Sequence, residues 1–139
     1  MRILILCTGN SCRSQMAEGF MRSFDDSLEV RSAGTFPAGY IQPLAIRVMK
    51  EAGIDISGQE SENVDKYTGQ DFDYVITVCD DANETCPHFS GKVRRRIHMG
   101  FEDPTFFDGT EEERLQEFRR VRDRIKAGFS DLYRQIIKS

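Results

Sequence analysis

Residues 2–14 read RILILCTGNSCRS, an apolar run followed by a short polar stretch that holds two cysteines and an arginine. The run from Arg2 to Leu6 is short and rich in isoleucine and leucine, which predicts a buried strand. From Arg13 to Phe24 apolar residues recur at helical spacing, which predicts a helix. The polar stretch between them is therefore expected to be a tight loop from the end of a strand to the start of a helix.

A loop of this kind is suited to binding an anion. Backbone N–H groups of the loop and of the helix N-terminus point inward and carry partial positive charge. Gly9 permits a tight turn, and Arg13 adds planar donors that suit a tetrahedral oxyanion. The same field is expected to lower the pKa of Cys7, which would make Cys7 a thiolate nucleophile. The alternative is that Cys7 simply packs in the core, as free cysteines often do.

The rest of the chain alternates strands and helices. Further strands are predicted at residues 28–32, 72–78 and 96–99, and further helices at residues 43–52 and 110–137. This alternation predicts an α/β fold, with a small four-stranded parallel sheet flanked by helices in one domain of residues 1–139. Cys7 and Cys79 each follow a predicted strand, so we expect them to share the ligand-binding edge of the sheet.

Smaller features refine this outline. Thr110 and Glu113 have the spacing of a capping box, and an apolar stripe runs along the final helix to Ile136. Residues 57–71 are polar and are expected to form a loop with a short helix. The segment from residue 80 to residue 91 is expected to be a loop or a frayed helical turn, because Pro87 and Gly91 interrupt it.

Composition excludes several classes of protein. Of the 139 residues, 39% are hydrophobic and 30% charged, a balance that argues against disordered and fibrous chains. The net charge of −4 provides no global field for nucleic acid, so the run from Arg94 to Arg96 is interpreted as a solvated surface patch. The apolar runs are too short for a signal peptide or a membrane span, which predicts a cytoplasmic protein. Its four cysteines are then expected to be mostly reduced.

Motifs along most of the chain carry a family resemblance. The loop has the pattern C-x5-R-S within CTGNSCRSQMAEG, and SAG follows at residues 32–34, DIS at 55–57, VCDDANETCP at 78–87, GFEDP at 100–104 and EFRRVRDRI at 117–125. This set, in this order, resembles the low-molecular-weight tyrosine phosphatase fold family. Within that family it is similar to the branch of thioredoxin-coupled arsenate reductases. The resemblance implies the same fold and a cytoplasmic enzyme of arsenic resistance.

The resemblance also implies a relay of three thiols. Cys7 would attack arsenate, held by Arg13 and the loop amides, and Cys79 would attack the sulfur of Cys7 and expel arsenite. Cys86 would then attack Cys79, and thioredoxin would reduce the resulting Cys79–Cys86 disulfide. No tightly bound redox cofactor is expected, since the electrons come from thioredoxin. The oxyanion-binding residues would be Thr8, Gly9, Asn10, Ser11, Cys12, Arg13 and Ser14.

Other roles follow from the same motifs. Asp103 matches the general acid of the family, although an Asp-Pro pair by itself indicates only a turn. Ser14 resembles a serine that donates to the nucleophilic sulfur, and Asn10 resembles an asparagine that stabilises the loop backbone. Cys12 matches a cysteine that the relay does not require. The resemblance gives His88 and His98 no role, so both are expected to be surface or packing residues.

A potassium ion near the loop is found in some members of the family. Its positions correspond to Asn10, Ser32, Glu60 and Glu62. Glu60 stands where the family has threonine, which argues against the ion in this chain. Zinc is disfavoured as well, because the spacing of the four cysteines does not match the usual spacing of zinc ligands.

Two further hypotheses remain open. A tyrosine phosphatase would use only Cys7, Arg13 and Asp103, and the aromatic residues of Thr105-Phe106-Phe107 are similar to that branch. Phosphate and arsenate are nearly isosteric, so the loop does not separate the two activities. A thiol-based redox or metalloid sensor is the third hypothesis. A monomer without nucleic-acid or membrane partners is expected in each case.

Overall fold

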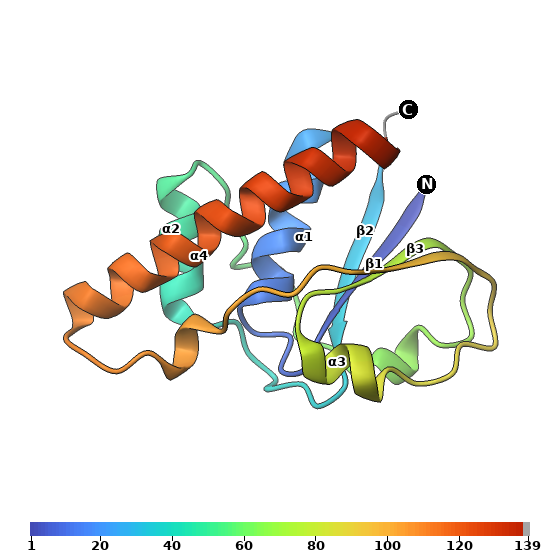
Figure 1. Ribbon diagram of the computed structural model, residues 1–139, viewed down its shortest axis with the longest axis horizontal. Coiled ribbons are helices and arrows are strands. Elements are labelled where there is room, and N and C mark those ends of the chain that lie inside the picture. Colours follow the sequence, from blue (N-terminus) through green and yellow to red (C-terminus); the bar gives the residue numbers. More distant parts are fainter. Residues whose placement is uncertain (138–139) are drawn as a thin grey trace.

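The computed structural model describes residues 1–137, except for the side chains of residues 81, 83 and 85. Within this part of the chain four strands form one parallel sheet in the order β2-β1-β3-β4 (Figure 1). The strands are β1 (Arg2–Cys7), β2 (Glu29–Gly34), β3 (Phe72–Thr77) and β4 (Val93–His98). The predicted four-stranded parallel sheet is confirmed.

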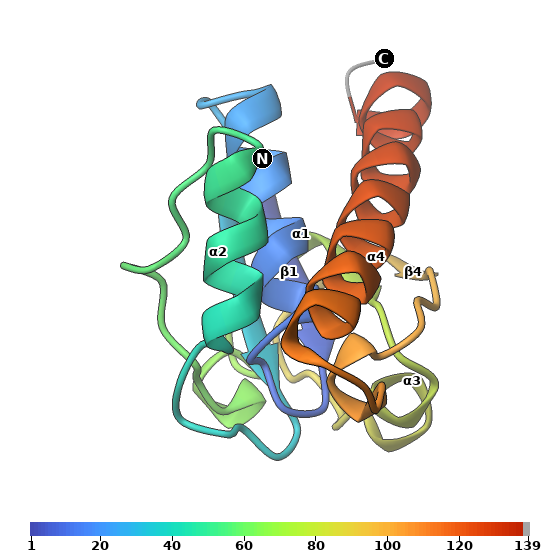
Figure 2. The ribbon, with the colours of Figure 1, turned by 90° about the vertical axis from the view of Figure 1, so that its left-hand side faces the viewer.

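The helices pack mainly on one side of this sheet. They are α1 (Arg13–Phe24), α2 (Pro43–Glu51), α3 (Asp80–Thr85) and α4 (Glu111–Leu132), with short 3-10 turns at Val64–Lys66 and Pro104–Phe106. Figure 2 shows α1, α2 and α4 gathered into one layer, in which α4 contacts both other helices. The short helix α3 lies apart from this layer, beyond the ends of β1 and β3 (Figure 1). No described helix is long and apolar enough to cross a membrane.

Much of the core lies between β1 and this helix layer. Residues 3–6 of β1 are 0% exposed, as expected for a central strand that is covered on both faces. The apolar stripe of α4 is buried from Leu115 to Leu132, and the capping box of Thr110 and Glu113 is present. The stripe was predicted to end at Ile136, but Ile137 is the buried residue. A π-helical turn at Tyr133–Ile137 changes the helical spacing there.

Several predicted boundaries were wrong at the polar ends of elements. β4 begins at Val93 and not at residue 96, because it is an edge strand whose exposed Arg94 and Arg95 hide the apolar pattern. β2 extends to Gly34, two residues beyond its prediction. The segment after Cys79 contains a six-residue helix, which agrees with the predicted helical turn and not with a loop.

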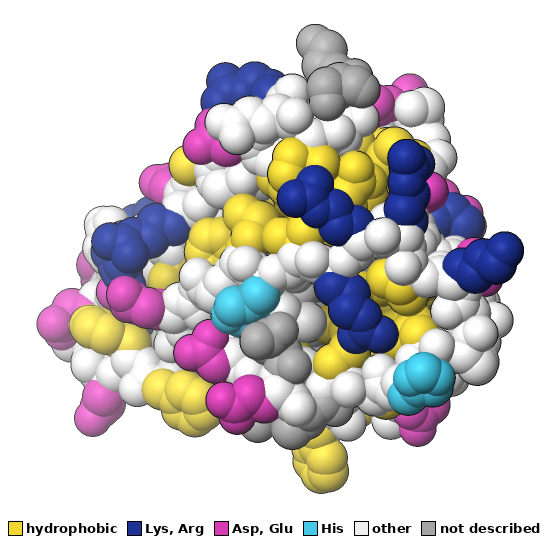
Figure 3. Space-filling model, turned by 45° about the vertical axis from the view of Figure 1, so that its right-hand side comes forward, with side chains coloured by type: hydrophobic (Ala, Val, Ile, Leu, Met, Phe, Trp, Pro, Cys, Tyr) yellow, Lys and Arg dark blue, Asp and Glu magenta, His cyan; other side chains and the backbone are white. Residues whose placement is uncertain are grey.

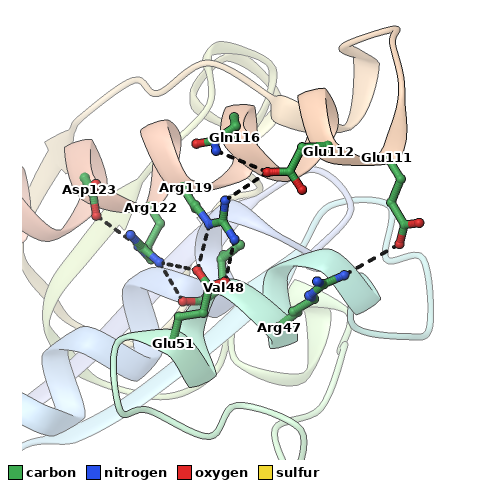
Figure 4. A network of polar contacts seen from close by, with 9 residues as sticks. All are labelled: Arg47, Val48, Glu51, Glu111, Glu112, Gln116, Arg119, Arg122 and Asp123. Carbon is green, nitrogen blue, oxygen red and sulfur yellow. Dashed lines mark hydrogen bonds and ion pairs between the residues drawn. The ribbon is translucent and has the colours of Figure 1, made fainter.

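A bidentate ion pair fastens α2 to α4 (Figure 4). Glu51 of α2 accepts hydrogen bonds from Arg119 at 2.9 and 2.7 Å and from Arg122 at 3.1 Å. The hydrogen bonds from Arg119 are the main reason that the pKa of Glu51 falls to about 2. Arg122 also donates to the carbonyl oxygen of Val48. Gln42, the residue before α2, donates its N–H to the carbonyl oxygen of Ser11. The ion pairs that fix α2 on α4 therefore also support the loop after β1.

Gly34 allows β2 to approach that loop closely. A Cβ atom at this position would lie 2.4 Å from the carbonyl oxygen of Thr8 and 3.1 Å from the Cβ of Asn10. Both neighbours belong to the loop, and the first is backbone, so the loop would have to shift.

Replacing Gly34 with alanine should therefore destabilise the fold by about 1–3 kcal/mol, as overpacking does elsewhere. Urea unfolding of the Gly34→Ala variant measures this cost. Gly58→Ala is the matched control, since a Cβ there meets nothing within 4 Å. Equal stabilities of the two variants would contradict the proposed close packing.

Candidate active site

A cleft of about 880 Å³ opens at the carboxyl ends of the strands. Its floor is the loop of residues 7–13, and its walls are residues 79–80 and the segment from Gly100 to Phe106. The prediction that Cys7 and Cys79 share one edge of the sheet is confirmed, since both line this cleft. Arg13 and Asp103 line it too, whereas Cys86 lies outside it.

Asn10 holds the loop in shape from within. It is fully buried and has a positive φ of 47°, a conformation that asparagine tolerates better than most residues. Its Nδ2 donates to the hydroxyl oxygens of Ser14 (2.8 Å) and Ser32 (2.9 Å), and its Oδ1 accepts from the N–H of Glu62 (2.9 Å). These three bonds tie the loop to α1, to β2 and to the segment after α2. Ser14 accepts from Asn10, which leaves the Ser14 proton for another acceptor.

Arg13 and Asp103 lie together on one side of the cleft. Arg13 donates from Nη1 to the carbonyl oxygen of Phe101 (3.0 Å) and from Nη2 to Asp103 Oδ2 (3.2 Å). The other carboxylate oxygen of Asp103 accepts from the N–H and the hydroxyl of Thr105. The guanidinium and the carboxylate are both partly buried. Arg13 is thus held in the cleft before any oxyanion arrives, and it brings Asp103 beside the loop.

The side chains of Cys7 and Cys79 share a hydrogen bond, which acts on the pKa of both. The Cys79 sulfur also lies 3.3 Å from the hydroxyl of Thr8, and it accepts from the N–H of Ala82 at 3.4 Å, where it caps α3. The hydrogen bond from Cys7, assisted by these two donors, lowers the pKa of Cys79 to about 5. The same bond and burial raise the pKa of Cys7.

The direction for Cys7 differs from the expectation that the loop lowers its pKa, although Arg13 and the backbone of Thr8 do act in the lowering direction. Within the pair, the hydrogen bond favours the proton on Cys7 and the negative charge on Cys79. The physical reason is a tertiary neighbour, since a second sulfur accepts the proton of Cys7 and collects two more donors.

The other two cysteines occupy different surroundings. Cys12 is buried, and burial raises its pKa, which suits a packing residue. Cys86 follows α3 directly and is partly exposed, and its sulfur accepts from Arg96 Nη1 at 3.4 Å. Cys79 and Cys86 bracket α3, so a helical rise over seven residues separates their Cα atoms by about 10 Å. All four cysteines are unbonded thiols.

Two of the positions matched to a potassium site make other polar contacts in this structure. Glu62 is already neutralised by an ion pair with Lys66 and accepts from the Tyr67 hydroxyl. Ser32 donates to Glu18, whose own charge is paired with Arg22. Among the described residues no cluster of three histidine, cysteine or carboxylate side chains could hold a metal ion. The chain thus supplies its own cations here, from Lys66 and Arg22.

Sequence reasoning missed three residues around the site. Glu18 is buried in α1, and burial raises its pKa; the signal was an acidic residue among the apolar positions of that helix. Gln15 donates to the carbonyl oxygens of Asn10 and Glu60, and nothing local indicated this. His98 was expected to be a packing or surface residue, yet its ring nitrogens lie 2.8 Å from Thr77 Oγ1 and 2.9 Å from Asp80 Oδ1.

The thiol pair predicts a distinct titration. One thiolate should appear with a midpoint near pH 5, because the lowered pKa belongs to Cys79. Thiolate ultraviolet absorbance measures this step in a Cys12→Ser/Cys86→Ser background. Cys79→Ser should remove the step, and Cys7→Ala should move it to higher pH by deleting the main donor. An unchanged step in the Cys79→Ser protein would show that Cys79 is not the thiolate.

Comparison with known proteins agrees with this geometry. The chain matches the family described as low molecular weight phosphotyrosine protein phosphatase over residues 2–139. An arsenate reductase of Halalkalibacterium halodurans is 48% identical over 124 residues, 88% of each chain. A solved structure described as an arsenate reductase in the phosphate binding state has a TM-score of 0.81 at 33% identity, covering 97% of this chain and 98% of that one. Another, in the oxidized state, has a TM-score of 0.79 at 31% identity, with the same coverage. With its oxyanion loop, its sheet and these relatives, the chain belongs to the low molecular weight phosphotyrosine protein phosphatase family.

Proposed function

We propose that this protein is an arsenate reductase that passes two electrons from thioredoxin to arsenate through Cys7, Cys79 and Cys86. The observation that carries the proposal is the contact of Cys79 with Cys7 on the floor of an oxyanion cleft. A phosphatase has no use for this second thiol. The curated relative at 48% identity, which is named an arsenate reductase, supports the same activity.

The first step forms a bond between Cys7 and arsenic. Loop N–H groups and Arg13 hold the arsenate oxygens, and the Cys7 sulfur attacks the arsenic atom. The thiol proton joins the hydroxyl of hydrogen arsenate, so one oxygen leaves as water and three remain on arsenic. Asp103 lies in the same cleft and can carry this proton to the leaving oxygen, as a general acid does. A protonated Cys7 in the free enzyme suits this balance.

The second step reduces arsenic. The Cys79 thiolate attacks the sulfur of Cys7, and the electron pair of the sulfur–arsenic bond stays with arsenic, which leaves as arsenite. The product is a Cys7–Cys79 disulfide. The lowered pKa of Cys79 provides the attacking thiolate near neutral pH, and its hydrogen bond to Cys7 places it next to its target.

The third step requires α3 to unwind. A disulfide needs Cα atoms about 4.4–6.8 Å apart, whereas a helical rise separates Cys79 and Cys86 by about 10 Å. The helix has only six residues, and the Cys79 sulfur caps its N-terminus through the N–H of Ala82. When Cys79 binds Cys7 it is no longer a charged acceptor, so a short and marginal helix loses its cap. Cys86 can then reach Cys79 and release Cys7.

Cys86→Ser should separate the first two steps from turnover. With thioredoxin, thioredoxin reductase and NADPH, the unmodified protein should turn over many times when arsenate is added. The Cys86→Ser protein should release about one arsenite per chain and then stop, because its Cys7–Cys79 disulfide is not passed on. Arsenite release and NADPH consumption measure both outcomes.

Cys12→Ser is the matched control and should keep multiple turnovers. Full turnover by the Cys86→Ser protein would rule out the relay. Oxidation of one cysteine pair without turnover in the unmodified protein would instead favour the sensor hypothesis.

A second activity, hydrolysis of aryl phosphates, is favoured by the rim of the cleft. Phe106 lines the cleft and is 85% exposed, so its ring is available to a substrate aryl group. The cleft volume of about 880 Å³ also exceeds the needs of a bare oxyanion. Phosphatase chemistry would use Cys7, Arg13 and Asp103 without the other two relay cysteines.

We expect weak release of p-nitrophenol from p-nitrophenyl phosphate. Cys86→Ser should leave this activity unchanged, whereas Phe106→Ala should raise KM more than it lowers kcat, because the ring contacts the substrate in its ground state. Steady-state absorbance measures both values. If the pure protein releases no p-nitrophenol, this second activity is absent.

A further inference from the structure

Cys86 is the accessible end of the cysteine pair. Cys7, Cys12 and Cys79 are each 4% exposed, whereas Cys86 is partly exposed and lies in a small pocket with Arg96 and His98. If the proposed relay holds, a reductant that opens the Cys79–Cys86 disulfide must therefore approach from the side of Cys86. The surface around Cys86 then decides which reductants can dock.

The strand beside Cys86 is basic. β4 pairs only with β3 among the described residues, so its other edge faces outward. It carries Arg94, Arg95 and Arg96, all exposed, and Arg96 donates to the Cys86 sulfur at 3.4 Å. Side chains alternate along a strand, so Arg94 lies on the same face as Arg96 and Cys86, and Arg95 lies on the opposite face.

This positive charge is local to β4. The chain has a net charge of −4, yet none of the three arginines forms an ion pair with a described side chain. Figure 3 shows basic side chains over this side of the molecule, with hydrophobic surface exposed between them. The helix α3 carries two exposed carboxylates, Glu84 and Asp80, and Asp80 is paired with His98 at the end of β4. An anionic partner would thus be attracted toward β4 and repelled from α3.

We propose that the face of β4 that carries Arg94 and Arg96 is the docking surface for the protein that reduces the Cys79–Cys86 disulfide. The partner is a dithiol protein with carboxylates beside its attacking thiol. Charges at the rim of such an interface mainly raise the rate at which the two proteins associate, and they affect the chemical step less. An edge strand also carries basic residues simply to prevent edge-to-edge pairing, and that role would not distinguish the two faces of β4.

The reduction balances in two exchanges. A thiolate of the partner attacks the Cys86 sulfur, the disulfide breaks, and the electron pair goes to Cys79. Once Cys79 is released as a thiolate, it regains the contacts that its sulfur makes in the reduced protein, with the hydroxyl of Thr8 and the N–H of Ala82. The second thiol of the partner then attacks the mixed disulfide and expels Cys86. The partner loses two electrons and forms a disulfide, and its protons pass to the released thiolates or to water.

Charge reversal on the two faces of β4 tests this surface. With thioredoxin as the reductant at low ionic strength, Arg94→Glu should raise its KM on the order of fivefold while kcat changes little. Arg95→Glu makes the same change of net charge on the opposite face and should leave KM nearly unchanged. The effect of Arg94→Glu should shrink in high salt, which screens exposed charges. With dithiothreitol, an uncharged dithiol, all three proteins should reduce arsenate at equal rates.

Small thiols give a second readout without any protein partner. Reduction of the oxidised protein by anionic 3-mercaptopropionate should slow in Arg94→Glu, while reduction by cationic cysteamine should accelerate. Equal effects of Arg94→Glu and Arg95→Glu, or no effect of either, would overturn the docking surface and leave the relay intact. Failure of the unmodified protein to reduce arsenate with dithiothreitol would instead overturn the proposed function, and the docking surface with it.

Discussion

The pairing register of β1 and β3 controls the chemistry of the cleft. Leu6 lies opposite Thr77, and the N–H of Val78 donates to the Leu6 carbonyl oxygen, so the two strands end side by side. Cys7 and Cys79 are consequently brought into hydrogen-bond contact. A shift of one residue would turn the Cys79 side chain to the other face of the sheet. The shared proton and the cap of α3 both depend on this register.

The loop that completes the cleft is supported from three directions. Asn10 links it to α1, to β2 and to the segment after α2, and Gly34 lets β2 approach to backbone contact. The ion pairs of Glu51 with two arginines of α4 fix α2, the helix that begins beside Ser11. Single exposed ion pairs contribute little, but this one is bidentate and joins two packed helices. An oxyanion site built on such supports needs little reorganisation when the anion binds.

The two thiols divide the proposed work between them. Cys7 keeps its proton, which the loss of water from arsenate consumes, and Cys79 keeps the negative charge, which the next attack uses. The same sulfur caps α3. When it forms the disulfide with Cys7 it loses its charge, and the helix that separates Cys79 from Cys86 is weakened. The redox state of the thiol pair and the stability of α3 are thus linked through the sulfur of Cys79. In the proposed scheme, the basic face of β4 next to Cys86 binds the partner that reduces the disulfide.

The sequence by itself predicted the sheet and the loop, and it named the candidate site residues. Local periodicity predicted α1 and the buried β1 strand, because each of these signals lies within a few residues. The C-x5-R-S spacing and the other motifs along the chain indicated the family. Tertiary structure alone decided that the pKa of Cys79 is lowered, since the causes include Cys7 and Thr8, which lie some seventy residues away in the chain. It also decided that Glu18 is buried and that Arg96 faces Cys86, because contacts between distant segments leave no local pattern.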